Sequence, residues 1–265
     1  MRRIRTIVSG SSGNATLVEV DGRFVVIDVG CTLRALRAGL RDLGADLDDI
    51  AAILLTHEHY DHVKGLGPIL RAARAEVYAS EGTLASLDKT DKLPSEVRYR
   101  LLRAGHELDL PAADLGVLPF AVSHDAAEPL GFVFSHGEHR LGYMTDTGQV
   151  EADARRNLAG CGRVILESNY DPQMLRDGPY PYLLKMRIQG RQGHLSNFAA
   201  AELAHFLIEQ GVEQITLAHL SRENNSPAQA RRTFLQYLDN RSVDWSVEDN
   251  LTIAPRLQAS ATLVW

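Results

Sequence analysis

The sequence predicts an α/β (α+β) protein in which two β-sheets are covered by helices on both outer faces. The 265 residues are 45% hydrophobic and 23% charged, which is typical of a globular protein with a substantial core. Short β-branched runs alternate with stretches of helical periodicity, and this alternation occurs twice along the chain. We expect a single domain over residues 1–265, because the chain has neither a Pro/Ser-rich linker nor an internal repeat.

The first half of the chain is predicted to begin with a β-meander. Predicted strands cover residues 4–8, 15–20, 24–27 and 52–55. Turn signals such as Asp21-Gly22 separate the first three of them. Residues 32–43 carry leucines at helical spacing and stop at Gly44, which predicts a helix between the meander and the next strand.

The second half repeats the pattern after a charged amphipathic stretch over residues 88–103. Further strands are predicted over residues 117–122, 130–135, 141–145, 164–166 and 215–218. Helices are predicted over residues 197–210 and 227–238, and the first should be capped by Ser196 and end before Gly211. These elements predict a second sheet with its own helices.

The net charge and the cysteine content limit which partners the protein can bind and in which cellular compartment we expect it. The net charge of −6 excludes non-specific attraction to nucleic acid, so any phosphate partner must be held by local cations or metals. Cys31 and Cys161 fit no paired CxxC spacing and are expected to be free thiols rather than ligands. No apolar run reaches the length of a membrane span, so we expect a cytoplasmic protein that makes no contact with membranes.

Residues 56–62 read THEHYDH and carry the strongest chemical signal in the chain. His57 and His59 alternate at the end of a predicted strand, so both side chains can reach one cation. A turn into a helix would swing Asp61 and His62 toward a neighbouring position. The motif therefore predicts two adjacent metal sites, and the alternative is a solvated histidine-rich loop.

Three further residues each follow an apolar run and are candidates to complete the two sites: His124, Asp146 and His219. Taken singly, each could equally be a cap or a surface residue. Together with the motif they supply seven donors. We expect His57, His59 and His124 on one metal, and Asp61, His62 and His219 on the other, with Asp146 bridging both. Imidazole and carboxylate donors suit two divalent ions per chain, zinc or manganese, and also admit iron.

The order of these motifs resembles that of the metallo-β-lactamase superfamily. Asp28 after a strand, the HxHxDH segment, and a later His, Asp and final His follow the family's five-motif order over nearly the whole chain. The resemblance implies a four-layer αββα sandwich with a dinuclear site at one rim. Asp28 is then similar to the family aspartate that orients the ligand loop without binding metal. Local sequence alone allows Asp28 to be a strand-ending turn residue.

The details of the motifs favour a phosphodiesterase branch. Residues 122–126 read VSHDA and lack the Pro-Gly-His-Thr type of segment usual in lactonase and glyoxalase-like members. The final motif, residues 217–225, resembles that of the tRNase Z branch, where Arg222 would offer a phosphate a bidentate fork. Residues 193–197 (GHLSN) resemble the tRNase Z segment whose histidine, here His194, protonates the leaving oxygen. Glu167 falls where that branch places the carboxylate that orients this histidine.

Each of these two residues has a structural alternative: His194 as a helix N-terminal residue and Glu167 as a strand-end surface acid. Residues 185–191 carry three cations and no acid, which suits either a local path for a polyanion or a solvated face.

Four blocks are similar to the YycJ (WalJ) group of the superfamily: residues 9–15, 166–171, 193–197 and 219–225. Members of that group are regarded as metal-dependent 5′-to-3′ exonucleases on double-stranded DNA, which implies the same activity here. The residues then expected to contact substrate are Ser11, Ser12, Asn14, Ser221, Arg222 and Asn224. The Ser/Gly-rich loop would offer backbone amides to phosphate oxygens, and a plain hairpin turn is the competing interpretation.

The expected catalytic residues are Asp61, Glu167 and His194. Two metals would bring the pKa of a shared water close to neutrality for in-line attack on phosphorus, and His194 would protonate the departing oxygen. A small-molecule phosphodiesterase that opens cyclic phosphates would use the same residues with a narrower entrance. A binding scaffold that holds metal without catalysis is the alternative from a different class. The sequence leaves the oligomeric state open.

Overall fold

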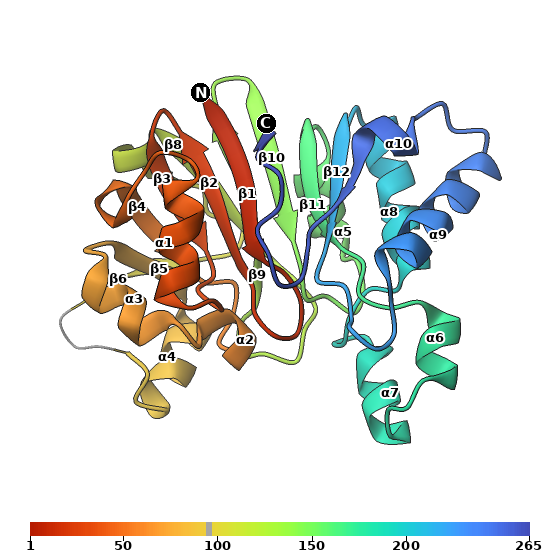
Figure 1. Ribbon diagram of the computed structural model, residues 1–265, viewed down its shortest axis with the longest axis horizontal. Coiled ribbons are helices and arrows are strands. Elements are labelled where there is room, and N and C mark those ends of the chain that lie inside the picture. Colours follow the sequence, from red (N-terminus) through yellow and green to blue (C-terminus); the bar gives the residue numbers. More distant parts are fainter. Residues whose placement is uncertain (94–96) are drawn as a thin grey trace.

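Two seven-stranded mixed sheets pack face to face, and helices cover the outer face of each sheet (Figure 1). This computed structural model describes residues 1–93 and 97–265. The predicted αββα arrangement is confirmed. In Figure 1 the helices α1, α3 and α4 of the first part of the chain lie on the left, and α8 and α9 of the second part lie on the right.

The first sheet has the strand order β14-β1-β2-β3-β4-β5-β6. Its strands are β1 (Arg2–Val8), β2 (Ala15–Val20), β3 (Arg23–Ile27), β4 (Ile50–Leu54), β5 (Glu76–Ser80), β6 (Tyr99–Leu102) and β14 (Leu263–Val264). β1 to β3 are antiparallel, as the predicted meander requires, and β3 to β6 are parallel. The parallel strands are connected through helices, which cover the outer face.

The second sheet has the order β13-β12-β11-β10-β9-β8-β7. Its strands are β7 (Leu108–Leu110), β8 (Leu115–Ala121), β9 (Leu130–His136), β10 (His139–Met144), β11 (Arg163–Glu167), β12 (Gln214–Ala218) and β13 (Leu251–Ile253). Its strands pair in the same pattern as those of the first sheet: the pairing is antiparallel from β7 to β10 and parallel from β10 to β13.

Helices lie where amphipathic segments connect the parallel strands. They are α1 (Leu33–Arg41), α2 (Tyr60–Val63), α3 (Leu66–Ala72), α4 (Glu81–Lys89), α5 (Ala152–Leu158), α6 (Pro172–Asp177), α7 (Tyr182–Ile188), α8 (Asn197–Glu209), α9 (Pro227–Asp239) and α10 (Val247–Asn250). Single 3₁₀ turns cover Leu47–Asp49 and Pro111–Ala113. Among the described residues, no helix is long and apolar enough to span a bilayer.

The predicted elements are found with boundaries shifted by at most two residues. Thr32 caps α1 by accepting from the amide of Ala35, and Ser196 caps α8 as predicted. The charged stretch 88–103 divides into the end of α4 and strand β6, while its residues 94–96 lie outside the described part of the chain. Helices α6 and α7 were not predicted, because each is a short segment with prolines at its start.

Three apolar layers hold the sandwich together. The layer between the sheets includes Val18 and Leu54 from one sheet and Phe132, Phe134 and Tyr143 from the other. The outer layers lie under α1 and α3 on one side and under α5, α8 and α9 on the other. The two free cysteines are buried in these opposite outer layers.

The parallel strands of both sheets end at one rim of the sandwich, the lower edge of Figure 1, where α2 and α7 also lie. The residues just past β3, β4, β10 and β12 include, in that order, Asp28, His57, Asp146 and His219. Glu167 is the last residue of β11. The fold therefore brings together, at this rim, four polar residues that follow strands and one polar residue, Glu167, that ends a strand.

Gly30 is the position where the end of β3 packs most tightly on the rim. A Cβ built at Gly30 would lie 1.6 Å from the carbonyl oxygen of Asp61 and 2.6 Å from the amide nitrogen of Asn14. The backbone of Gly30 also donates to Asn14, whose amide donates to Asp61. The loop that carries Asp61 and His62 thus rests on a residue without a side chain.

We therefore expect Gly30→Ala to lower the free energy of unfolding by about 1–3 kcal/mol, because backbone must move to admit the methyl group. Urea denaturation of the metal-free protein measures this. Gly162→Ala is the matched control, since nothing lies within 4 Å of a Cβ there. Equal midpoints for the two variants would contradict tight packing at Gly30.

Candidate metal centre

The loop after β4 and the first turn of α2 place His57, His59, Asp61 and His62 at the rim. Ligand atoms of His57, His59 and His124 lie within 4.8 Å of one another. The His57 ring centroid is 4.6 Å from that of His59 and 5.0 Å from that of His124. The structure thus brings together the three side chains expected to share the first metal.

A second group lies beside the first. Ligand atoms of Asp61, His62 and His219 also lie within 4.8 Å of one another. Asp146 lies between the groups, with Oδ2 3.3 Å from Nε2 of His62 and Oδ1 3.9 Å from Nε2 of His124. All seven residues expected as ligands are therefore gathered at one place, with Asp146 adjacent to both groups.

Unpartnered buried atoms test whether this cluster fits a cation. Among the described residues, three of the buried side-chain atoms without a hydrogen-bond partner are His57 Nε2, Asp146 Oδ2 and His219 Nε2. A buried polar atom without a partner is costly, and here one is found in each group and one between them. Imidazole nitrogens and carboxylate oxygens are good ligands for divalent transition metals. The residues fit two such ions.

Each expected histidine ligand is held through its other ring nitrogen. The contacts are His57 Nδ1 to Thr56 Oγ1 (3.0 Å), His59 Nε2 to the Asp125 carbonyl (3.2 Å), His62 Nδ1 to Asp28 (2.7 Å), His124 Nδ1 to the Gly193 carbonyl (2.9 Å) and His219 Nδ1 to Glu167 (2.9 Å). A ring nitrogen that donates to protein leaves the opposite nitrogen with its lone pair available for a metal.

Asp28 lies behind the ligand loop. Its Oδ1 accepts from the amide of Thr56 and its Oδ2 accepts from the Thr56 hydroxyl, both at 2.8 Å, while Oδ2 also accepts from His62. The side chain is fully buried. These contacts occupy both carboxylate oxygens and orient the loop.

The two groups differ in charge state. Burial and the neighbouring His62 hold the pKa of His57 well below its ordinary value, and burial also lowers the pKa of His124. Burial alone would lower the pKa of His62, but the carboxylates of Asp28 and Asp146 outweigh it and raise the pKa to about 9. The pKa of His219 is raised well above its ordinary value, because Asp146, Asp61 and Glu167 outweigh burial.

Glu167, which is fully buried, and His194, which is partly exposed, form a hydrogen-bonded pair beside the metal ligands. Oε1 of Glu167 accepts from Nδ1 of His194 at 2.8 Å and from Nδ1 of His219 at 2.9 Å. Oε2 accepts from the amides of Thr147 and Leu195. Burial raises the pKa of Glu167, but the two histidines outweigh it and hold the pKa well below its usual range. Glu167 is therefore ionised at neutral pH.

The six residues expected to contact substrate divide into two sets. Ser11, Ser12 and Arg222 are exposed at the surface. Asn14, Ser221 and Asn224 are buried, with 2%, 5% and 0% of their surface exposed.

Asn14 has a clear structural role. It accepts from the amide of Gly10, and its side-chain nitrogen lies 3.3 Å from Asp61 Oδ2 and 3.0 Å from His62 Nε2. Asn14 thus joins the Ser/Gly-rich turn to two expected ligands. The turn also uses the Gly13 amide internally, by donation to Gly10.

Two residues at the site were not singled out from the sequence. Asp125 reaches the first group through its carbonyl oxygen, and its Oδ1 lies 3.5 Å from Nε2 of His124. Asn169 donates to the carbonyl of His219 at 2.9 Å. Because Asp125 directly follows the candidate ligand His124, its place in the sequence could have indicated that it lies at the site. Asn169 contacts the backbone of His219, which is 50 positions away, and nothing in the sequence indicates that contact.

Comparison with known proteins defines the class of the molecule. The family model "Beta-lactamase superfamily domain" matches residues 23–220. Exodeoxyribonuclease YycJ of Bacillus anthracis is 35% identical over 236 residues, covering 89% of this chain and 88% of the relative. Ribonuclease Z of Methanopyrus kandleri is 33% identical over 245 residues, covering 77% and 79%. The chain belongs to the metallo-β-lactamase superfamily. It is a metal-dependent hydrolase, and the resemblances inferred from its motifs are confirmed.

A solved structure supports the fold. The zinc-bound PqqB of Methylobacterium extorquens superposes with a TM-score of 0.72 at 18% identity, covering 99% of this chain and 100% of that one. The two proteins share the fold, and the relative holds zinc.

Metal content tests the assignment of ligands. We expect the unchanged protein to bind two divalent ions per chain, and His57→Ala or Asp61→Ala to bind fewer, because each removes a donor from one group. Elemental analysis after dialysis against Zn²⁺ or Mn²⁺ measures this. His136→Ala is the control, since that ring lies outside both groups and its Nδ1 donates to the Asp114 carbonyl. Two ions retained in both ligand variants would contradict the assignment.

Metal affinity should depend on pH more steeply at the second group. Below a pKa of about 9, metal must displace a proton from His62, and it must also displace one from His219. Affinity should therefore rise from pH 6.5 toward pH 9 by about tenfold per unit for each displaced proton. His57 is already neutral, so the first group should show a shallower dependence. Titration calorimetry of His57→Ala and of Asp61→Ala separates the groups, and equal slopes would contradict the assigned charge states.

Proposed function

We propose that the protein is a phosphodiesterase that removes nucleotides from the 5′ end of double-stranded DNA. The observation that carries the proposal is the His194–Glu167 pair at the edge of the ligand cluster. Thioester hydrolysis expels a thiolate, which departs without a proton, so it has no need of a further histidine that an ionised, buried carboxylate holds beside the metal ligands. Cleavage of a phosphodiester needs a proton for an alkoxide leaving group, and such a pair supplies it.

The geometry of His194 suits it to proton donation. Its ring lies 5.1 Å from the ring of His124 and 5.2 Å from that of His219, so it faces ligands of both groups. Nδ1 is occupied by Glu167, which leaves Nε2 to exchange a proton with substrate. The side chain is 17% exposed, unlike the fully buried Glu167. The carboxylate of Glu167 fixes the orientation of the ring by accepting from Nδ1.

The seven ligand residues would hold two divalent ions, zinc or manganese, with Asp146 between them. Ions bound there would lower the pKa of water and polarise a phosphoryl oxygen. Asp61 and Asp146 add negative charge that neutralises the ions, and Asp28 and Asn14 keep the ligand loop in place.

The choice of DNA rests on relatives. YycJ is named an exodeoxyribonuclease and aligns with nearly the whole of this chain. The exposed Ser11, Ser12 and Arg222 would then contact the phosphate backbone. Cleavage from the 5′ end of a duplex is what the resemblance to the YycJ (WalJ) group implies.

The test is a time course on blunt duplex DNA labelled at the 5′ end, with protein loaded with Mn²⁺ or Zn²⁺. We expect immediate release of labelled mononucleotide or very short product. His194→Ala should keep two metals and lose about 100- to 10,000-fold in rate, because the leaving oxygen departs without a proton. Its rate on bis(p-nitrophenyl) phosphate should fall far less, since p-nitrophenolate departs unprotonated.

His57→Ala is the control for contaminating nuclease. Full activity of His194→Ala on DNA would contradict its role as general acid. A ladder of slowly shortened labelled products would contradict the 5′ polarity. Uncut duplex under both metals, together with turnover of a cyclic phosphate, would replace DNA by a small phosphodiester as the substrate.

A further inference from the structure

Helices α6 and α7 form a hairpin that projects from the catalytic rim, at the lower right of Figure 1. One face of α7 packs inward, where Leu184 and Ile188 contact a small cluster with Tyr170, Leu175 and Tyr180. Lys185 anchors the helix by donating to the carbonyl of Arg176 at the end of α6. These contacts hold α7 against α6 and the segment that follows β11.

The opposite face of α7 is apolar and exposed. Tyr182 is 71% exposed, Leu183 79% and Met186 44%. Residues four apart share a helix face, so Tyr182 lies one turn before Met186, and Leu183 lies one turn before Arg187. Large apolar side chains exposed together beside an active site mark a binding surface rather than a stable solvated face.

This face continues into a cavity of about 570 Å³ beside the metal centre. Met186, Arg187 and Arg191 line one wall, and Ser123 and Asp125 line the other. The second wall directly adjoins the candidate ligands, because Ser123 precedes His124 and the Asp125 carbonyl accepts from His59. A chain lying along α7 would therefore reach the catalytic residues through this cavity.

The hairpin is basic within an acidic protein. Residues 172–192 contain four cations and one acid, whereas the whole chain has a net charge of −6. Arg187 pairs with Asp125 through two contacts of 2.5 and 3.1 Å, which closes the cavity on one side. Arg191 has no ion-pair partner among the described residues, and its carbonyl accepts from Ser123. Its guanidinium is available for a phosphate.

We propose that α7 and the turn through Gln192 form an arm that holds the duplex end against the metal centre. Arg191 binds a backbone phosphate, while Tyr182 and Leu183 stack against the exposed bases of the terminal pair. The Arg187–Asp125 ion pair holds α7 beside the metal ligands. The inference rests on the proposed function and adds how the enzyme distinguishes the end of a DNA duplex from its interior. A continuous duplex has no open base face, so the apolar face of the arm can be covered only at an end.

Charge and chemistry together favour a nucleic acid as the occupant. The cations match phosphates, and aromatic and aliphatic side chains at the tip match the faces of bases. A small phosphodiester would fit within the cavity and leave Tyr182 and Leu183 uncovered.

The experiment measures binding of a short blunt duplex by fluorescence anisotropy in the His194→Ala background, and cleavage in the unchanged background. The double variant Tyr182→Ala/Leu183→Ala should weaken binding and raise KM on duplex DNA by about tenfold, with a much smaller change in kcat. Arg191→Ala should weaken binding about threefold and reduce the slope of log affinity against log salt by about one. A circular duplex should compete poorly with the blunt one.

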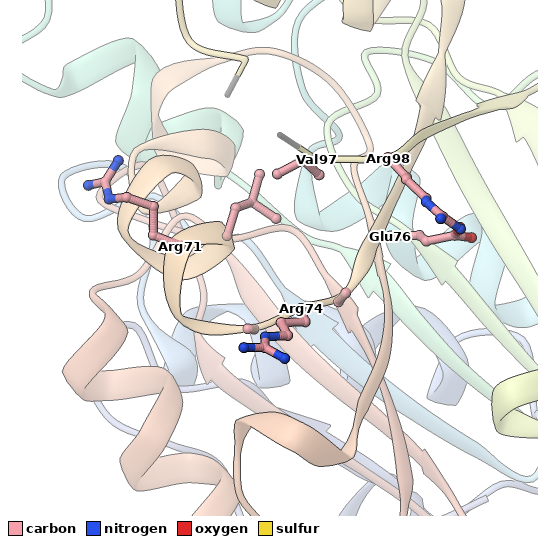
Figure 2. Close-up of a pocket in the computed structure, with 8 residues that line it drawn as sticks. Arg71, Arg74, Glu76, Val97 and Arg98 are labelled. Atoms are coloured by element: carbon pink, nitrogen blue, oxygen red, sulfur yellow. The ribbon is translucent and has the colours of Figure 1, made fainter. Parts of the chain in front are cut away.

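Matched control variants exist elsewhere on the molecule. Val264→Ala removes part of an apolar side chain that is 65% exposed and that lines a hollow with Arg163 and Gln214, the first residues of β11 and β12. Arg74→Ala removes an arginine from the hollow shown in Figure 2, which Arg71 and Arg98 also line. That hollow includes Glu76, the first residue of β5, so it lies at the end of the sheet opposite the metal centre. Both controls should bind and cleave like the unchanged protein.

The outcomes separate this proposal from the proposed function. Arm variants that bind duplex like the controls, in a protein that cleaves DNA, would overturn the arm alone. Arm-dependent binding without any cleavage would overturn the proposed function and keep the arm. Failure of every form to bind duplex would overturn both. Loss of metal in the arm variants would also overturn the arm, because their effect would then be structural.

Discussion

The rest of the site depends on one repeated interaction, the hydrogen bond that holds the far nitrogen of each imidazole at the centre. Five expected histidine ligands each donate one ring N–H to a protein oxygen. Three of these oxygens belong to side chains and two to the backbone. Since one ring nitrogen is held by the protein, the ring cannot rotate, and its opposite nitrogen faces the group to which the histidine belongs. Without these partners the imidazole rings could rotate, and the site would not be preorganised to bind metal.

Three of the residues at the strand ends have strained backbone conformations, which lowers the stability of the fold. Asp28, Asp146 and His219 adopt φ angles of +58°, +55° and +56°, in the left-handed region that favours glycine. Each such residue costs about 1–2 kcal/mol, and glycine would relieve the strain but remove the side chain. The strands before them are buried and paired on both sides, which holds the strained residues in place. The sheets thus stabilise a rim that would not form in an isolated loop.

The sequence predicted the parts of this architecture that leave a periodic or clustered trace. Buried strands and the capped helix α8 were found near their expected boundaries, and the seven expected donors lie together. What it could not predict depends on contacts between distant segments. The carbonyls of Asp125 and Gly193 hold two histidines, yet any residue type has a carbonyl. Asn14 was expected to face substrate because it lies in a polar turn, but the approach of Asp61 and His62 buries it.

Glu167 shows why the metal centre and the proton donor must be treated as one unit. A single oxygen, Oε1, accepts from both His219 and His194. Removing either histidine would leave a buried carboxylate with fewer partners, and removing Glu167 would free two rings at once, so losses from these residues are not additive. The same sharing has a geometric consequence. Because His219 is an expected ligand of the second group, a shift of its ring would move Oε1 of Glu167 and with it the ring of His194. The position of the proton donor therefore depends on the ligands of the second group, so the donor is placed correctly only in the assembled centre.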